Sequence, residues 1–159
     1  MLKRLLPSVA DFAYTGSRVS LWLLGLVLFM KLGIALGAIF NGHYAASVAD
    51  GIPIDSYTPQ ATQAFLSLFA SLGLSQFMLG LLGALLLFRY RPLVLLVPLF
   101  LLVLLIEYLA RKGVNAYLPI ARSGNAPGGV INWAIFGVML LAFVLSMRQS
   151  NVPPPPPEA

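Results

Sequence analysis

Apolar positions in this chain gather into four long runs, and most charged side chains fall between the runs. The runs cover about residues 20–41, 62–88, 92–110 and 130–147. A helix that crosses the apolar core of a bilayer needs about 20 consecutive apolar residues. The pattern therefore predicts an all-α, polytopic membrane protein, with a bundle of four transmembrane helices over residues 18–149.

Both ends of the chain differ from this apolar body. Residues 1–17 mix apolar and basic groups, which predicts a short segment lying on the cytoplasmic membrane surface; a disordered basic leader would have the same composition. Residues 150–159 are rich in proline, which cannot continue a helix. We expect a solvated, disordered tail there, or a segment that docks in an aromatic groove of another protein.

Composition agrees with burial in lipid. Of the 159 residues, 59% are hydrophobic and 9% are charged, whereas soluble domains carry about 25% charged residues. The mean hydropathy is +0.89. Ten basic residues outnumber five acidic ones, but the basic residues flank the apolar runs instead of forming one patch. The predicted partner is thus the lipid bilayer, and no nucleic acid is expected.

The basic residues also predict an orientation, because cytoplasmic loops are enriched in lysine and arginine. With four crossings, six basic residues would lie on the side of the N-terminus and three on the other side. The first outer loop, residues 42–61, has neither lysine nor arginine. We therefore expect both termini in the cytoplasm. A second outer loop is expected over residues 111–129, resting on the membrane surface.

Two helix ends can be predicted from local signals. Thr58 followed by Pro59 is typical of an N-cap with proline at the first helical position. Only residues 89–91 separate the second and third runs before Pro92. The second and third helices should therefore form an antiparallel hairpin with a tight turn.

Residues that ordinarily carry chemistry are scarce. The chain has no cysteine and one histidine, His43, which excludes disulfides, thiolate metal sites and a cysteine nucleophile. A bis-histidine haem within one chain is excluded as well. We expect no metal site and no catalytic residue, and a redox role would need a cofactor without protein ligands, such as a quinone.

Lys31 and Glu107 are the charged residues placed deepest in the runs. At 1.5 Å per residue they lie about 17 Å and about 24 Å from the cytoplasmic edge. Ionisable groups in a bilayer usually face the bundle interior and find partners, which predicts an ion pair between the first and third helices. The alternative is that Glu107 pairs with Arg111 at i, i+4 while Lys31 extends toward the outer interface.

Other polar residues could join this pair. Gln76 lies near the middle of the second run, Tyr108 follows Glu107, and Asn132 opens the fourth run. Amides in membrane helices often hydrogen-bond between helices as structural contacts. Together with Lys31 and Glu107, these three residues could instead line a pocket in the outer half that holds a quinone head or a small anion.

Small residues recur at four-residue spacing on two runs. Gly33 and Gly37 form one pair, and Ser67, Ser71 and Ser75 form a second stripe. Such stripes let helix backbones approach closely. They predict either packing inside the bundle or docking of a partner subunit or a second copy of the chain.

Three features of the chain carry a family resemblance: Lys31 and Leu32 closing the apolar first helix, the loop to Pro53, and the run Leu79–Gly83 leading to Arg89. Together they resemble the DoxX-like group of four-helix bacterial membrane proteins. The resemblance covers about residues 21–147 and implies a bacterial inner-membrane location. That group includes small subunits tied to quinone-linked sulfur oxidation, but no catalytic motif of the group is matched residue by residue here.

Two classes of function remain open. The first is a non-enzymatic accessory, structural or assembly component of the inner membrane, which suits the smooth helix faces. The second is a membrane subunit of a quinone-linked oxidoreductase that seats a quinone at Lys31, Gln76 and Glu107. A transporter is disfavoured because the runs contain no broken helix.

Overall fold

The computed structural model describes residues 17–88, 97–119 and 126–148, and in these ranges the chain is almost entirely helical, without a strand. Short helical turns follow the first long helix: α3 (Gly42–Tyr44), the π-helix η1 (Ala45–Ala49) and the 3-10 turn η2 (Ile54–Ser56). Four long helices make up the rest: α2 (Arg18–Phe40), α4 (Pro59–Phe88), α5 (Val97–Tyr117) and α6 (Pro127–Met147). The all-α class is confirmed.

Side-chain caps and prolines set several helix ends. The Ser17 hydroxyl accepts a hydrogen bond from the Val19 N–H at 3.3 Å and caps α2. At the start of α4, the Thr58 hydroxyl accepts from the Ala61 N–H at 3.3 Å, which confirms the predicted N-cap ahead of Pro59. The C-terminal end of α5 is set by a proline. The helix stops at Tyr117, two residues before Pro119, because the residue before a proline disfavours the helical conformation.

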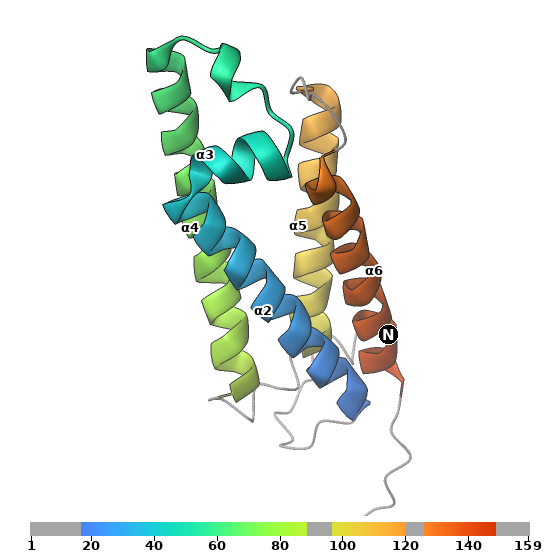
Figure 1. Ribbon diagram of the computed structural model, residues 1–159. Helices are drawn as coiled ribbons and strands as arrows, with labels where there is room; N and C mark the ends of the chain where they lie inside the picture. Colours follow the sequence, from blue (N-terminus) through green and yellow to red (C-terminus); the bar gives the residue numbers. More distant parts are fainter. Residues whose placement is uncertain (1–16, 89–96, 120–125, 149–159) are drawn as a thin grey trace, which may run out of the picture.

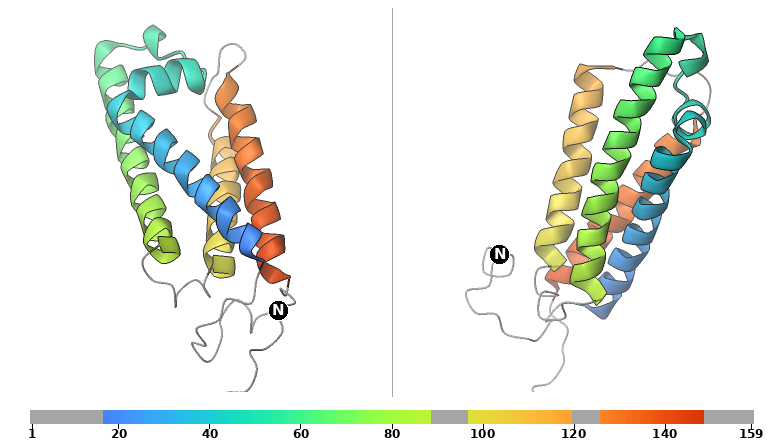
Figure 2. Two further views of the ribbon diagram at one scale, coloured as in Figure 1. Left: turned by 60° about the horizontal axis from the view of Figure 1, so that its bottom comes forward. Right: turned by 90° about the vertical axis from the view of Figure 1, so that its left-hand side faces the viewer.

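The four long helices form one bundle (Figures 1 and 2). α2 crosses the face of the bundle and packs on both α4 and α6, while α5 packs mainly on α6. α2 begins where α6 ends, and the Ser17 N–H donates to the Leu145 carbonyl at 3.4 Å. We call the end of the bundle where α2 begins and α6 ends the base end. The opposite end is the cap end, and residues 42–56, which cover it, are the cap.

A close-packed apolar core fills the base half. Leu24, Val27, Leu101, Leu104 and Met139, from three helices, are all 0% exposed. They belong to one continuous cluster that extends up to Tyr108.

Glycines on α4 allow the neighbouring helices to approach. A Cβ at Gly83 would lie 2.6 Å from Leu28 Cδ2 on α2 and 2.6 Å from Phe100 Cε1 on α5. A Cβ at Gly73 would lie 2.9 Å from Ala38 Cβ. Close packing of α2, α4 and α5 therefore depends on glycine at these positions.

The stripes of small residues face away from the bundle, so the expectation that they pack inside it was wrong. A Cβ at Gly33 or Gly37 would meet no atom of the described chain within 4 Å. The hydroxyls of Ser71 and Ser75 donate to the carbonyls of Ser67 and Ser71, four residues earlier, at 2.9 and 3.1 Å. Docking through these stripes stays a prediction, because the four-residue spacing sets a helix face but not which way it points.

The cap is folded, although the sequence suggested a plain loop. Ala46, Ile52 and Ile54 are buried in a second small cluster against Phe65 and Phe69 of α4. The start of α6 holds the cap closely, since a Cβ at Gly128 would lie 2.6 Å from the Ala49 carbonyl oxygen. The cap therefore bridges α4 and α6.

α5 continues beyond the predicted end of the third run at Ala110. Residues 111–117, expected in an outer loop, form its last two turns. The Arg111 guanidinium contacts Glu107 one turn earlier, and no proline occurs between Ala110 and Pro119. This part of the loop prediction was wrong because charge alone does not end a helix.

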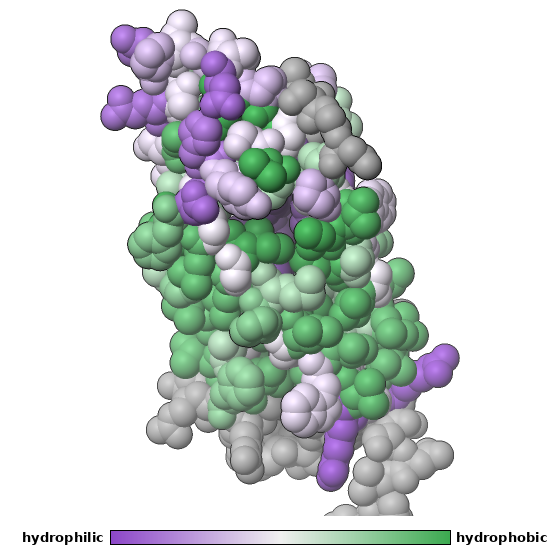
Figure 3. Space-filling view, viewed as in Figure 1, coloured by the Kyte–Doolittle hydropathy of each residue, from purple (hydrophilic) through white to green (hydrophobic). Residues whose placement is uncertain are grey.

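Three of the described helices, α2, α4 and α6, are long and apolar enough to cross a membrane. α5 has a similar length but carries Glu107, Arg111 and Lys112. Apolar side chains cover the middle of the bundle, and hydrophilic ones gather at the cap end (Figure 3). The predicted surface segment, the tight turn at 89–91 and the proline-rich tail lie almost wholly outside the described residues.

Candidate functional site

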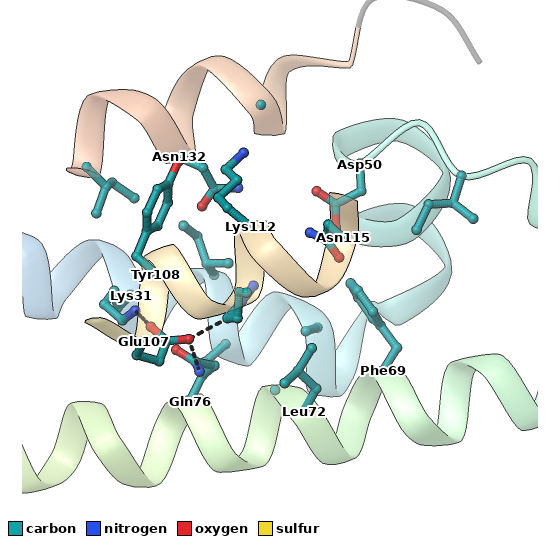
Figure 4. A pocket seen from close by; sticks show the side chains of 18 of the residues that line it. Lys31, Asp50, Phe69, Leu72, Gln76, Glu107, Tyr108, Lys112, Asn115 and Asn132 are labelled. Atoms are coloured by element: carbon teal, nitrogen blue, oxygen red, sulfur yellow. Dashed lines mark hydrogen bonds and ion pairs between the residues drawn. The ribbon is translucent and has the colours of Figure 1, made fainter. Parts of the chain in front are cut away.

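A pocket of about 350 Å³ lies in the cap half of the bundle, between α4 and α5 (Figure 4). α2 and α6 supply further walls, and Asp50 of the cap lies at its rim. α4 and α5 touch at Gly83 and Phe100 in the base half and diverge toward the cap end (Figure 1). The pocket occupies the space that this divergence opens.

Glu107 of α5 is the centre of a polar network at one end of the pocket. Its Oε2 accepts a bond from Lys31 Nζ of α2 at 3.1 Å. Its Oε1 accepts from Gln76 Nε2 of α4 at 3.0 Å and from Arg111 Nη1 at 3.3 Å. One carboxylate thus ties three helices together (Figure 4).

The two predicted pairings of Glu107 coexist. The Lys31–Glu107 ion pair is confirmed as a contact, and the side chains are 11% and 21% exposed. The Arg111–Glu107 pair is present as well, with the arginine 46% exposed. The two pairings were expected as alternatives. They can form together because Lys31 binds Oε2 of Glu107 and Arg111 binds Oε1.

All five residues of the predicted pocket line this one pocket. Besides Lys31, Gln76 and Glu107, these are Tyr108 and Asn132. Tyr108 is 8% exposed, and its Oη has no hydrogen-bond partner among the described residues. A buried hydroxyl without a partner is uncommon, and this oxygen has less than 1 Å² of accessible surface, so it does not face the open pocket.

Lys112 lies beside an aromatic cluster on the same side. Its Nζ is 5.5 Å from the ring centroid of Tyr108 and 5.2 Å from that of Trp133. The Tyr108 ring stacks on Phe136 with centroids 4.8 Å apart. Cation–π contacts of this kind stabilise an ammonium group in partly apolar surroundings.

The opposite wall is apolar. α4 contributes Phe65, Leu68, Phe69 and Leu72 to the pocket. Leu68 is 73% exposed and Leu72 is 45% exposed, so this wall runs out to the side of the bundle. The pocket therefore has one polar wall and one apolar wall. Cationic and amide groups on α5 and α6 lie opposite aliphatic and aromatic groups on α4.

Four polar lining residues were missed from the sequence: Asp50, Arg111, Lys112 and Asn115. The last three were placed in a loop, although Lys112 and Asn115 follow Tyr108 at four and seven residues, which is one face of a continuing helix. Asp50 could not be found this way, because its position depends on the fold of the cap.

Metal binding finds no support in the described residues. No group of three histidine, cysteine, aspartate or glutamate side chains lies close enough there to hold an ion. His43 Nε2 lies 3.1 Å from Asp55 Oδ1, with both side chains more than half exposed. This pair stands on the outside of the cap, away from the pocket.

No family model, curated protein or solved structure matches this chain. The resemblance to DoxX-like proteins thus stays a prediction, and the pocket has to be interpreted from its own geometry.

Both oxygens of Glu107 are engaged by neighbouring side chains, since the carboxylate accepts three hydrogen bonds from Lys31, Gln76 and Arg111. The amide and ammonium groups that line the pocket have further N–H donors that can bind a small molecule.

Proposed function

We propose that this chain is a small integral protein of a bacterial inner membrane, with four helices crossing the bilayer and both termini in the cytoplasm. Three apolar helices support the crossing. α2 starts at the end of the bundle where α6 finishes, as four crossings require. The excess of basic residues on that side supports the orientation.

α5 is the fourth crossing in this proposal. Its described length of 21 residues is about that of a bilayer span. Its three charged residues, Glu107, Arg111 and Lys112, lie between its midpoint and its cap end and line the pocket. Charged groups in a membrane helix are tolerated when they face the bundle interior and find partners; Glu107 pairs with Lys31 and Arg111, and Lys112 contacts two aromatic rings.

Within the membrane, the protein acts as a non-enzymatic accessory component that holds a small molecule in its outer half. The pocket carries this proposal, because its volume of about 350 Å³ falls at the lower end of small-ligand sites. Its mixture of apolar wall and converging polar groups is typical of such sites.

A membrane subunit of a quinone-linked oxidoreductase is the second candidate. Lys31 and Gln76 present donors that could bind a quinone carbonyl. Phe65 and Phe69, stacked on each other with ring centroids 5.8 Å apart, could pack against one side of a quinone ring. These observations fit the DoxX-like resemblance, which we retain as part of this second proposal.

The outward stripes suit contact with other subunits or with a second copy. Gly33 and Gly37 on α2 lie in open space, where another helix could approach closely. An accessory protein needs such a surface, whereas a protein working alone would present it only to lipid.

Purification in a mild detergent followed by mass spectrometry of bound subunits and small molecules tests both candidates. A homo-oligomer or non-redox complex with a small molecule other than a quinone supports the accessory function. A stoichiometric redox subunit or quinone supports the second candidate. A polypeptide that is folded and monomeric in detergent-free buffer would contradict both.

A further inference from the structure

We propose that the pocket takes the anionic head of a single-chain amphiphile, a carboxylate or a phosphate, with the chain leaving sideways between α4 and α5. This inference rests on the proposed ligand-binding function and adds the chemical class of the ligand.

Charge is the first argument. The pocket is lined by three cations, Lys31, Arg111 and Lys112, and two anions, Asp50 and Glu107. Lys31 and Arg111 both contact Glu107, so two positive charges face one negative charge in the network. An uncompensated positive charge in low-dielectric surroundings favours an anion nearby.

Lys112 is the group best placed to meet that anion. Within the described ranges, no carboxylate lies within salt-bridge distance of its ammonium, whose contacts are the Tyr108 and Trp133 rings. Lysine has three donors, and the ring faces leave these available.

Depth in the bilayer is the second argument. Arg111 and Lys112 lie five to six residues before the end of α5 at Tyr117, or about 8–9 Å along the helix. The headgroup layer of a bilayer is about 5–8 Å thick on each side. With the end of α5 at the water-facing side of this layer, the two cations lie at its boundary with the hydrocarbon core, and their long side chains can reach the head of an amphiphile in the outer leaflet.

The apolar wall supplies the third argument. Leu68 and Leu72 line the pocket and also reach the side of the bundle, where they would meet lipid chains. An alkyl chain can follow them out of the pocket without crossing water. The volume of about 350 Å³ suits a head and the start of one chain and is too small for a two-chain phospholipid.

The fluorescence of Trp133 can report ligand binding, since its ring contacts Lys112. The chain has two tryptophans, so Trp22→Phe leaves Trp133 as the single reporter. The full-length variant in a maltoside detergent is titrated with palmitate and dodecyl phosphate, with hexadecanol as the uncharged chain and with acetate and inorganic phosphate as heads without chains. We expect saturable fluorescence changes with the two charged amphiphiles only.

Lys112→Gln in this background should weaken binding at least tenfold. Arg148→Gln, which removes one cation at the base end, should leave the affinity unchanged. Arg111→Gln gives a second test if Lys112→Gln fails to fold, as judged by its circular dichroism and elution volume.

Several outcomes would overturn the inference. A hexadecanol affinity equal to that of palmitate, or equal effects of Lys112→Gln and Arg148→Gln, would exclude an anionic head while leaving ligand binding intact. Saturation by acetate or phosphate alone would assign the site to a free anion. A response to a short-chain ubiquinone alone would favour the quinone-linked function. The absence of a fluorescence change with every probe would contradict the proposed ligand-binding function as well.

Discussion

The base half of the bundle closes on apolar side chains, whereas the cap half closes on charged and amide groups around a pocket. In the base half, α4 and α5 touch through Gly83 and the Phe100 ring. Seven residues higher on each helix, Gln76 and Glu107 span a wider gap with a hydrogen bond of 3.0 Å. The same pair of helices therefore changes from direct packing to a polar bridge within two turns.

This difference separates the tasks of folding and binding. The closed half supplies most of the buried apolar contacts, so it can hold the helices in place. The open half then tolerates a pocket, because Glu107 ties three helices together without filling the space between α4 and α5. Variants that affect one half and not the other can test this division.

The largest effect is expected in the closed half. Leu101→Ala removes a side chain that is 0% exposed, and such a truncation costs about 2–5 kcal/mol. The matched control on α5 is Leu109→Ala, since Leu109 is 55% exposed and its loss should cost about 0.5 kcal/mol or less. Denaturant titration in detergent measures both free energies of unfolding. Equal losses would mean that the base half has no packed core.

The polar bridge should show the next largest effect. Glu107→Leu leaves the Lys31 ammonium without its carboxylate, which should cost about 3 kcal/mol. Lys31→Met should cost less, because Glu107 keeps Gln76 and Arg111.

A double-mutant cycle measures the coupling between Lys31 and Glu107. The variant carrying both substitutions should lose at least about 1 kcal/mol less than the sum of the single losses. Strict additivity would show that the ion pair contributes nothing to the cap half.

The smallest effect concerns the contact between α4 and α5 in the base half. Gly83→Ala places a Cβ against Leu28 and Phe100, and the overpacking should outweigh the gain in helix propensity by about 1 kcal/mol. Gly137→Ala is the control, because its Cβ meets open space and should stabilise the helix by about 0.5–1 kcal/mol. If both variants gain stability, α4 and α5 do not touch at this level.

Much of the fold could be predicted from hydropathy and local signals. The four apolar runs gave the helices, and Thr58 with Pro59 gave the start of α4. Counting residues along two parallel helices also placed Lys31 and Glu107 at heights from which they could meet. These features depend on one helix or on a simple relation between two helices.

The remaining features depend on tertiary contacts. Gly73 packs against Ala38, but a single glycine among apolar residues gives no spacing signal. Gly33 and Gly37 have the spacing and face outward, because α2 turns Ala35 and Ala38 toward α4 instead. The folded cap was also missed, since burial of Ile52 and Ile54 depends on the loop folding back onto Phe65 and Phe69 of the next helix, α4.

The membrane topology is the claim on which the rest depends, and cysteine labelling tests it most directly. The chain has no cysteine, so Ser17→Cys, Gln60→Cys and Arg148→Cys each introduce one unique thiol. We expect a membrane-impermeant maleimide to label Gln60→Cys in intact spheroplasts and to label Ser17→Cys and Arg148→Cys only after permeabilisation. Labelling of Ser17→Cys and Arg148→Cys from opposite sides of the membrane would contradict four crossings.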